Sequence, residues 1–167
     1  MREDRKKILL AAVVILISAI LLILAFRDVG RADVITEQVW VLCDPDSYVT
    51  LRTGPGKNKP DFGGVLCGAE LWTDNKIKNG FLHVVEVPAE FDTGWISSRY
   101  IVYDRPEEVN LVMQIRGDGR VAVRKWVKGP VKGWILPGEQ VTVWWMSDSW
   151  AVTRRGYIRS EFLEVVP

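Results

Sequence analysis

Three side chains of this sequence could support nucleophilic chemistry: its two cysteines and its single histidine. Cys43 or Cys67 could supply a thiolate, and His83 could act as the base that activates it. His83 lies in an apolar run that reads as a strand, and no spacing brings it to either cysteine. We therefore expect an ordinary, half-exposed strand histidine, with catalysis as the alternative. Two cysteines and one histidine also fall short of the four ligands of a structural zinc site, so no metal and no cofactor is expected.

The elements that must position these residues are set by an internal repeat. Residues 94–101 read Gly-Trp-Ile-Ser-Ser-Arg-Tyr-Ile, and residues 156–163 read Gly-Tyr-Ile-Arg-Ser-Glu-Phe-Leu. Both copies place a glycine before an aromatic and a β-branched residue, followed by a polar turn and an aromatic-aliphatic pair. Each copy is therefore expected to be the last strand of one unit.

The remainder of the two units aligns on that ending. Residues 39–52 align without a gap with residues 111–124, and residues 63–73 align in the same way with residues 133–143. Most of the difference in length falls within residues 76–92, as expected where a surface connection accepts insertions. The short apolar runs between Gly, Pro and Asn or Asp turns are typical of strands. The sequence predicts a mainly β fold made of two small tandem units.

Composition narrows the possible functions. A formal net charge of +1 gives no sign of a generic nucleic-acid binder, so no nucleic acid is expected as a partner. Eight tryptophans are a heavy aromatic load for 167 residues. Large aromatic side chains suit small barrels, which must bury much area with few residues.

The alternation within residues 141–146 predicts which tryptophans face outward. Successive side chains of a strand point to opposite faces, so if Val143 faces the core, Trp145 does so too and Trp144 faces out. Trp72 has the corresponding outward place in the first unit. An outward tryptophan either covers the neighbouring unit or stacks on a ligand.

The N-terminal region predicts a membrane anchor. From Ile8 to Phe26 the chain is apolar except for Ser18, which is long enough for a helix that crosses a bilayer core of about 30 Å. More basic residues precede this run than closely follow it, so the positive-inside rule predicts a cytoplasmic N-terminus and an extracytoplasmic remainder. A cleaved signal peptide is the alternative, although its apolar core is usually only about 7 to 15 residues long.

These boundaries give a predicted organisation for the whole chain. Residues 1–30 form the cytoplasmic tip and the single-pass transmembrane helix, and residues 31–38 form a short linker. Residues 39–105 and 106–167 form the first and second β units. The short linker is expected to hold the first unit close to the membrane surface.

One stretch carries a resemblance to a known family. Residues 49–56, Val-Thr-Leu-Arg-Thr-Gly-Pro-Gly, resemble the opening signature of bacterial SH3 (SH3b) domains, in which an alternating strand ending in Arg enters a Gly-Pro-Gly loop. Residues 68–73 and 94–96 resemble later motifs of that family. The second unit departs from the pattern, because Lys125-Trp126-Val127 stands in place of Thr-Gly-Pro. The resemblance implies two tandem SH3-like barrels that bind cell-wall peptides or protein partners and carry out no chemistry.

A candidate binding groove follows from this resemblance and from the aromatic residues. Shape and aromatic stacking would bind the ligand, and a few polar groups would fix its orientation. The candidate residues are Tyr48, Arg52, Pro55, Trp72, Trp95, Trp144 and Tyr157.

The two cysteines leave two interpretations open. An oxidising compartment would permit a disulfide between Cys43 and Cys67, and closing a loop of about 25 residues would stabilise the fold by about 3 to 4 kcal/mol. Against a bridge, Cys43 aligns with Ile115, and a buried cysteine can serve as a small hydrophobic residue.

The sequence therefore predicts a membrane-anchored, extracytoplasmic, non-catalytic binding module that recognises cell-wall peptide, cell-wall glycan or an envelope protein. One alternative is a structural subunit of an envelope secretion or conjugation assembly. A cell-wall-modifying enzyme is the second alternative.

Overall fold

The computed structural model describes residues 36–86 and 93–166. Both β-sheets belong to one compact unit that begins at Thr36. The apolar run from Ile8 to Phe26 lies outside the described residues. Within the described residues, no helix is both long and apolar enough to cross a bilayer. The anchor, its orientation and the cellular location therefore stay predictions.

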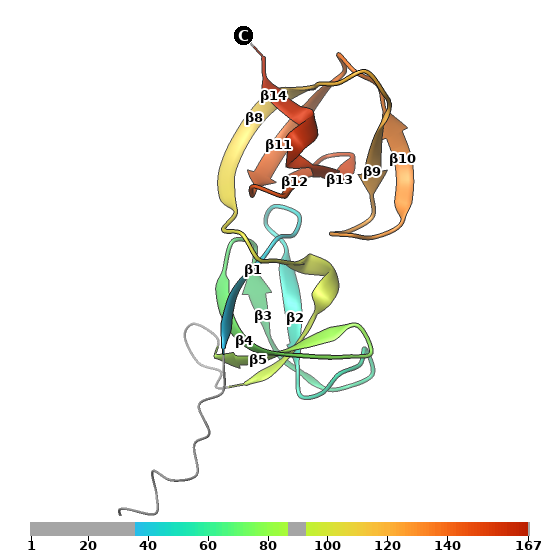
Figure 1. The fold of residues 1–167 in the computed structure, drawn as a ribbon. Helices are drawn as coiled ribbons and strands as arrows, with labels where there is room; N and C mark the ends of the chain where they lie inside the picture. Colours follow the sequence, from blue (N-terminus) through green and yellow to red (C-terminus); the bar gives the residue numbers. More distant parts are fainter. Residues whose placement is uncertain (1–35, 87–92, 167) are drawn as a thin grey trace, which may run out of the picture. The chain divides into compact units, whose positions relative to one another are not determined.

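The first sheet contains seven antiparallel strands, and one 3₁₀ turn connects its last two strands in the sequence (Figure 1). These elements are β1 (Glu37–Val41), β2 (Tyr48–Arg52), β3 (Asp61–Leu66), β4 (Glu70–Lys78), β5 (Phe81–Glu86), β6 (Gly94–Ser97), η1 (Ser98–Tyr100) and β7 (Ile101–Val102). The strands follow one another in the order β3-β2-β6-β5-β4-β1-β7.

The second sheet repeats this plan strand for strand. Its elements are β8 (Glu107–Ile115), β9 (Val121–Arg124), β10 (Val131–Ile135), β11 (Gln140–Met146), β12 (Trp150–Thr153), β13 (Gly156–Arg159), η2 (Ser160–Phe162) and β14 (Leu163–Val165). The strand order is β10-β9-β13-β12-β11-β8-β14, which is the order of the first sheet. The predicted mainly β fold and the internal duplication are confirmed, because Gly94 and Gly156 open the corresponding strands β6 and β13.

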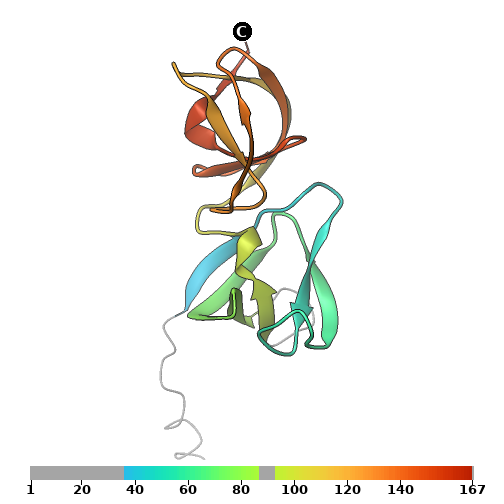
Figure 2. The ribbon, with the colours of Figure 1, turned by 90° about the vertical axis from the view of Figure 1, so that its right-hand side faces the viewer.

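Each sheet curls around an apolar core of its own (Figure 2). On β2 the alternation buries Val49 and Leu51 and leaves Tyr48, Thr50 and Arg52 on the outer face. The largest fully buried side chains of the two cores include Leu51, Leu71, Leu82, Ile96, Ile115, Ile135 and Ile158.

Close packing requires a glycine at Gly94 and at Gly156, the first residues of the two repeated segments 94–101 and 156–163. A Cβ on Gly94 would come within 2.7 Å of the Phe62 ring and 2.9 Å of Leu51 Cγ. A Cβ on Gly156 would come within 2.6 Å of the Arg124 carbonyl oxygen, and the φ of Gly156 is +130°. No side chain fits at either place without displacing its neighbours, which accounts for the repeated glycine.

The predicted inward position of Trp145 is wrong. The pairing of β11 shifts between Val143 and Trp145 against both of its neighbours, so the alternation of faces breaks there. Trp144 and Trp145 are both half-buried and both pack against a third apolar cluster rather than the core of the second sheet. Strict alternation was the right rule for Val141 and Val143 only.

This third cluster has buried members that belong to neither sheet core, although Cys67 and Tyr100 pack against both it and the first core. Its buried members are Leu42, Val102, Val127, Trp150, Val152 and Tyr157. Half-buried residues around it include Trp40, Cys67, Tyr100, Trp126, Trp144 and Trp145. The cluster draws on both sheets, so most of the large aromatic load is used for packing.

Candidate functional site

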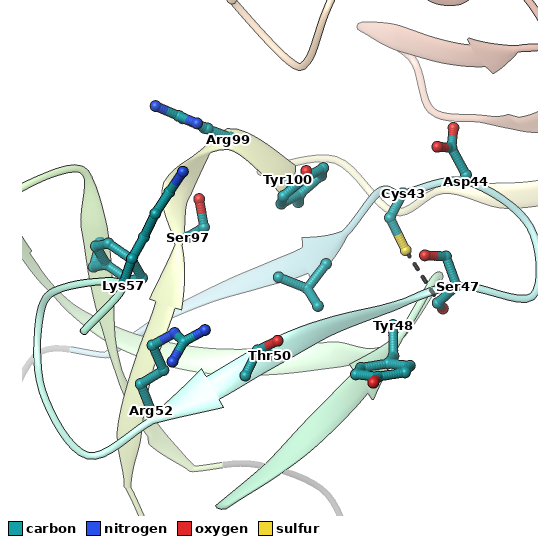
Figure 3. A pocket seen from close by; sticks show the side chains of 12 residues that line it. Cys43, Asp44, Ser47, Tyr48, Thr50, Arg52, Lys57, Ser97, Arg99 and Tyr100 are labelled. Carbon is teal, nitrogen blue, oxygen red and sulfur yellow. Dashed lines mark hydrogen bonds between the residues drawn. The ribbon is translucent and has the colours of Figure 1, made fainter. Parts of the chain in front are cut away.

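A cavity of about 300 Å³ opens on the outer face of β2 in the first sheet (Figure 3). The lining residues are Cys43, Asp44, Ser47, Tyr48, Val49, Thr50, Arg52, Lys57, Phe81, Ser97, Arg99 and Tyr100. They come from β2, the adjoining loops, the start of β5 and the turn between β6 and β7. We call this cavity the cationic pocket, because Arg52, Lys57 and Arg99 line it. Among the described lining residues Asp44 alone is acidic.

Arg52 is held rigidly at one end of the pocket. Its Nη1 donates a hydrogen bond to the Lys59 carbonyl oxygen at 2.8 Å and lies 3.9 Å from Asp61 Oδ2. The backbone of the same loop is closed by a hydrogen bond from Thr53 N–H to the Pro60 oxygen at 3.0 Å. The guanidinium is therefore already ordered, which lowers the entropic cost of binding an anion.

In the second sheet, equivalent hydrogen bonds close the corresponding loop, although the loop has a different sequence. Arg124, which aligns with Arg52, donates from Nη1 to the Gly129 carbonyl oxygen at 2.7 Å, and Lys125 N–H donates to the Pro130 oxygen at 3.1 Å. The departure from the family motif at residues 125–127 therefore alters the loop and leaves its closure unchanged. Arg52 is in this respect a structural residue as well as a pocket residue.

The other two cations of the pocket keep their charge available. Figure 3 shows the ends of Lys57 and Arg99 on the same side of the pocket as Ser97. The Arg99 guanidinium lies 4.2 Å from the centre of the Trp126 ring, which orients it without neutralising it. Within residues 36–86 and 93–166, neither Lys57 nor Arg99 forms a salt bridge. Two unpaired cations beside hydroxyl groups favour an anionic ligand.

The structure brings together only part of the predicted groove. Tyr48 and Arg52 both line the cationic pocket. Pro55 lies in the loop after β2, where its carbonyl oxygen accepts a hydrogen bond from Asn79 Nδ2 at 3.2 Å. Trp95 packs against His83 with ring centroids 4.8 Å apart and the ring planes tilted by 44°. Trp72 is half-buried outside the three apolar clusters of the described residues.

Trp144 and Tyr157 pack in the third cluster and do not line the cationic pocket. Tyr157 is 3% exposed, and its hydroxyl donates a hydrogen bond to the Leu42 carbonyl oxygen at 3.2 Å. Burial raises the pKa of the Tyr157 hydroxyl, and nearby acidic groups, Asp44 foremost, raise it further. The Tyr157 hydroxyl therefore binds the chain's own backbone.

Lys57 and Arg99 were missed by sequence reasoning. Arg99 lies in the polar turn of the repeat ending, where Glu161 stands in the second copy. This reversal of charge between two otherwise matching turns could have indicated Arg99 as a functional residue. Lys57 lies in the loop between β2 and β3, which is longer than the corresponding loop between β9 and β10. The alignment of the two copies therefore gives Lys57 no equivalent residue.

His83 is engaged with residues other than the cysteines. Its Nδ1 lies 3.0 Å from Asp74 Oδ1, an ion pair when the imidazole is protonated, and its Nε2 lies 3.0 Å from Thr93 Oγ1. Thr93 Oγ1 also donates to the Val84 carbonyl oxygen at 2.9 Å. These contacts join β4 and β5 to the residue that precedes β6.

Cys43 and Cys67 are free thiols that hydrogen-bond to each other's residues. Cys43 N–H donates to Cys67 Sγ at 3.1 Å, and Cys67 Sγ–H donates to the Cys43 carbonyl oxygen at 3.0 Å. The thiol of Cys43 and nearby backbone N–H groups lower the pKa of Cys67, whereas the hydrogen bond with Cys67 and burial raise the pKa of Cys43. The two sulfurs are neighbours, and they are not bridged.

Comparison with known proteins finds likenesses among solved structures alone. No family model matches the chain, and no curated protein matches it. Among solved structures, the chain is similar to NlpC1 from Trichomonas vaginalis, with 16% identity over 82% of this chain and 48% of that one, and a TM-score of 0.36. It is also similar to NlpC2 from the same organism, with 14% identity over 78% of this chain and 48% of that one, and a TM-score of 0.33. The chain spans about half the length of these structures.

Proposed function

We propose that this chain is a non-catalytic binding module of two tandem SH3-like barrels, held at the outer face of a membrane by the run from Ile8 to Phe26. In this proposal the module belongs with bacterial SH3 domains and binds carboxylate-bearing cell-wall peptides in the cationic pocket. The observation that carries the proposal is the convergence of Arg52, Lys57 and Arg99 on one cavity of about 300 Å³.

The motif that resembles the SH3b signature supports the same site. Residues 49–56 form most of strand β2 and the start of the loop that Arg52 closes by its hydrogen bond to Lys59. The motif thus builds one wall of the pocket, and Lys57 follows it directly. Three residues of the signature, Val49, Thr50 and Arg52, line the cation-rich cavity.

The chemistry of the lining favours a carboxylate. Arg and Lys form charge-assisted hydrogen bonds with carboxylates, and the Thr50 and Ser97 hydroxyls can donate to the same oxygens. The fixed guanidinium of Arg52 suits a planar two-oxygen group. A peptide is favoured because free carboxylates occur at its C-terminus and on acidic side chains.

A non-catalytic role fits the partners of the reactive side chains. Cys67 donates a hydrogen bond to the Cys43 carbonyl oxygen, and the His83 ring nitrogens contact Asp74 and Thr93. His83 does not line the cationic pocket in the described structure. A thiolate and its base are therefore not placed together at the cavity, as nucleophilic catalysis would require.

Binding of matched peptides to the full chain in mild detergent tests the proposal. An N-acetylated tetrapeptide with a free C-terminus is compared with its C-terminal amide by calorimetry, and purified peptidoglycan is tested by pull-down. We expect wild-type protein to bind the amide about tenfold more weakly than the free acid. We expect the double variant Lys57→Gln, Arg99→Gln to bind the free acid about tenfold more weakly than wild-type protein does. The exposed control Lys78→Gln should bind like the wild type. Equal binding of acid and amide, or no peptidoglycan binding above background, would overturn the proposal.

A structural role in an envelope assembly is the second candidate. It is favoured by apolar side chains on and beside the edge strand β10: Val131, Trp134 and Leu136 are 40%, 47% and 60% exposed. An edge strand offers unpaired backbone groups, and exposed apolar residues there mark a protein contact. Crosslinking in cells from position 134 would give a discrete protein adduct if this role is correct.

A further inference from the structure

Tyr48 forms an exposed aromatic shelf on the first sheet. A Cβ on Gly64 would collide with the Tyr48 ring, so the ring lies directly against the backbone of β3 at that glycine. The side chain is nevertheless 65% exposed. An aromatic residue that is supported from below and open to solvent is available for stacking.

The second sheet has an aromatic residue at the same place with a cation above it. Gly64 pairs with Thr50, and Trp134 pairs with Ala122 at the aligned position. Arg120 aligns with Tyr48, and its guanidinium lies 4.2 Å from the centre of the Trp134 ring. The aromatic group has therefore moved from one strand to the other, and in the second copy the chain covers it with its own Arg120.

The surroundings of Tyr48 also favour a cation. A shallow cavity of about 470 Å³ lies beside the ring, lined by Tyr48, Thr50, Asp61, Gly63, Gly64 and Leu66. Asp61 is the charged member of this described lining. Its side chain is 66% exposed, and its 3.9 Å separation from Arg52 is the outer limit of an ion pair. A carboxylate beside an open ring attracts a positive group and repels an anion.

The shelf and the cationic pocket are continuous. Tyr48 and Thr50 line both cavities, and Tyr48, Thr50 and Arg52 share the outer face of β2. At about 3.3 Å per residue, the Cα atoms of Tyr48 and Arg52 are about 13 Å apart, which an extended peptide of about four residues spans. One peptide can thus reach both cavities.

We propose that the ligand is a peptide with opposite charges at its two ends: a carboxylate for the cationic pocket and, about three residues earlier, an ammonium or guanidinium group for the Tyr48 shelf. The proposal rests on the proposed function, since it takes the carboxylate site from there. A purely apolar side chain on the shelf would make no use of the Asp61 carboxylate, and an acidic side chain would be repelled by it. A basic side chain satisfies both the ring and the carboxylate.

Fluorescence anisotropy on the full chain in mild detergent tests this inference. Three peptide probes carry an N-terminal fluorophore. The first has a free C-terminus and Lys three residues before its last residue. The second has norleucine in place of that Lys, and the third is the Lys peptide as its C-terminal amide. Wild-type protein should bind the Lys peptide about fivefold more tightly than the norleucine peptide. Tyr48→Ala and Asp61→Asn should remove this preference and retain the preference for acid over amide.

Matched variants separate the two proposals. Tyr48→Phe should keep the preference for Lys, and Arg120→Ala in the second sheet should leave it unchanged. Equal binding of the Lys and norleucine peptides, with the acid still preferred over the amide, would overturn the further inference and leave the proposed function intact. Binding that is indifferent to both charges would overturn both.

Discussion

Asp74 and His83 lie on neighbouring strands, with 3.0 Å between Asp74 Oδ1 and His83 Nδ1, which is an ion pair when the imidazole is protonated. The other carboxylate oxygen of Asp74 lies 2.7 Å from Lys76 Nζ. The Asp74 side chain is only 4% exposed, whereas the side chains of Lys76 and His83 are 71% and 22% exposed. A nearly buried carboxylate of this kind is tolerated because it is paired.

This pair predicts an acid-dependent loss of stability. Burial by itself raises the pKa of Asp74, but hydrogen bonds from Lys76 and His83 outweigh it, so the pKa lies below its ordinary value. A lowered carboxylate pKa stabilises the fold above about pH 3.9, and this stabilisation is lost as the pH falls through the lower folded-state value. Asp74→Asn should therefore lower the free energy of unfolding by about 1 to 2 kcal/mol at pH 5 and by almost nothing near pH 2. Denaturant titrations at the two pH values measure the difference.

The exposed control Asp118→Asn should show no comparable dependence on pH. A loss for Asp74→Asn that is the same at both pH values would contradict the role assigned to the charge of Asp74.

Replacing either repeat glycine with alanine should destabilise its sheet. Because a Cβ on Gly94 or Gly156 would meet neighbouring atoms at 2.7 or 2.6 Å, we expect losses of about 1 to 3 kcal/mol, the larger for Gly156 with its φ of +130°. Gly133→Ala is the matched control, because a Cβ there meets nothing within 4 Å. Thermal unfolding should rank Gly156→Ala below Gly94→Ala and both below Gly133→Ala, and equal melting temperatures would contradict the packing argument.

Removing the Tyr157 hydroxyl should have a measurable cost. Tyr157→Phe leaves the buried Leu42 carbonyl oxygen without the 3.2 Å hydrogen bond, which predicts a loss of about 1 kcal/mol. Tyr48→Phe removes a hydroxyl from a 65% exposed side chain and should change stability by less than about 0.5 kcal/mol. Equal denaturation midpoints for Tyr157→Phe and the wild type would show that the hydrogen bond contributes no net stability.

The two cysteines should differ in reactivity. The pKa of Cys67 is lowered and its side chain is half-buried, whereas the pKa of Cys43 is raised and its side chain is buried. Because the thiolate is the reactive form, iodoacetamide at neutral pH should alkylate Cys67 first. Peptide mass spectrometry over time measures the two rates. Faster alkylation of Cys43 would contradict the assignment, and the single variant Cys67→Ser should leave Cys43 nearly unmodified.

The fold was readable from the sequence because it is duplicated. Two copies of a glycine, an aromatic and a β-branched residue located β6 and β13, and the alignment then located the strands on either side. Strand alternation correctly placed Val141 and Val143 inside. It failed at Trp145, because the register shift next to this residue depends on how β8 and β12 pair with β11, which is a property of three strands and not of one.

The candidate site was only partly readable, for a different reason. Aromatic residues were predicted as ligand contacts, and the same residues also pack: Trp144 and Tyr157 belong to the third cluster while lining another cavity, and Trp95 packs on His83. Small cores need large side chains, so packing competes with binding for the aromatic residues of a short chain. Lys57 and Arg99 are far apart in sequence, and folding alone brings them to one cavity.

The exchange of Tyr48 and Gly64 for Arg120 and Trp134 has a consequence for stoichiometry. In the proposed binding mode, Arg120 occupies in the second copy the place that the positive group of the peptide takes in the first copy. Duplication in this chain therefore does not double its valency: titration should end at one peptide per polypeptide, and any avidity for a polymeric surface must come from many chains side by side.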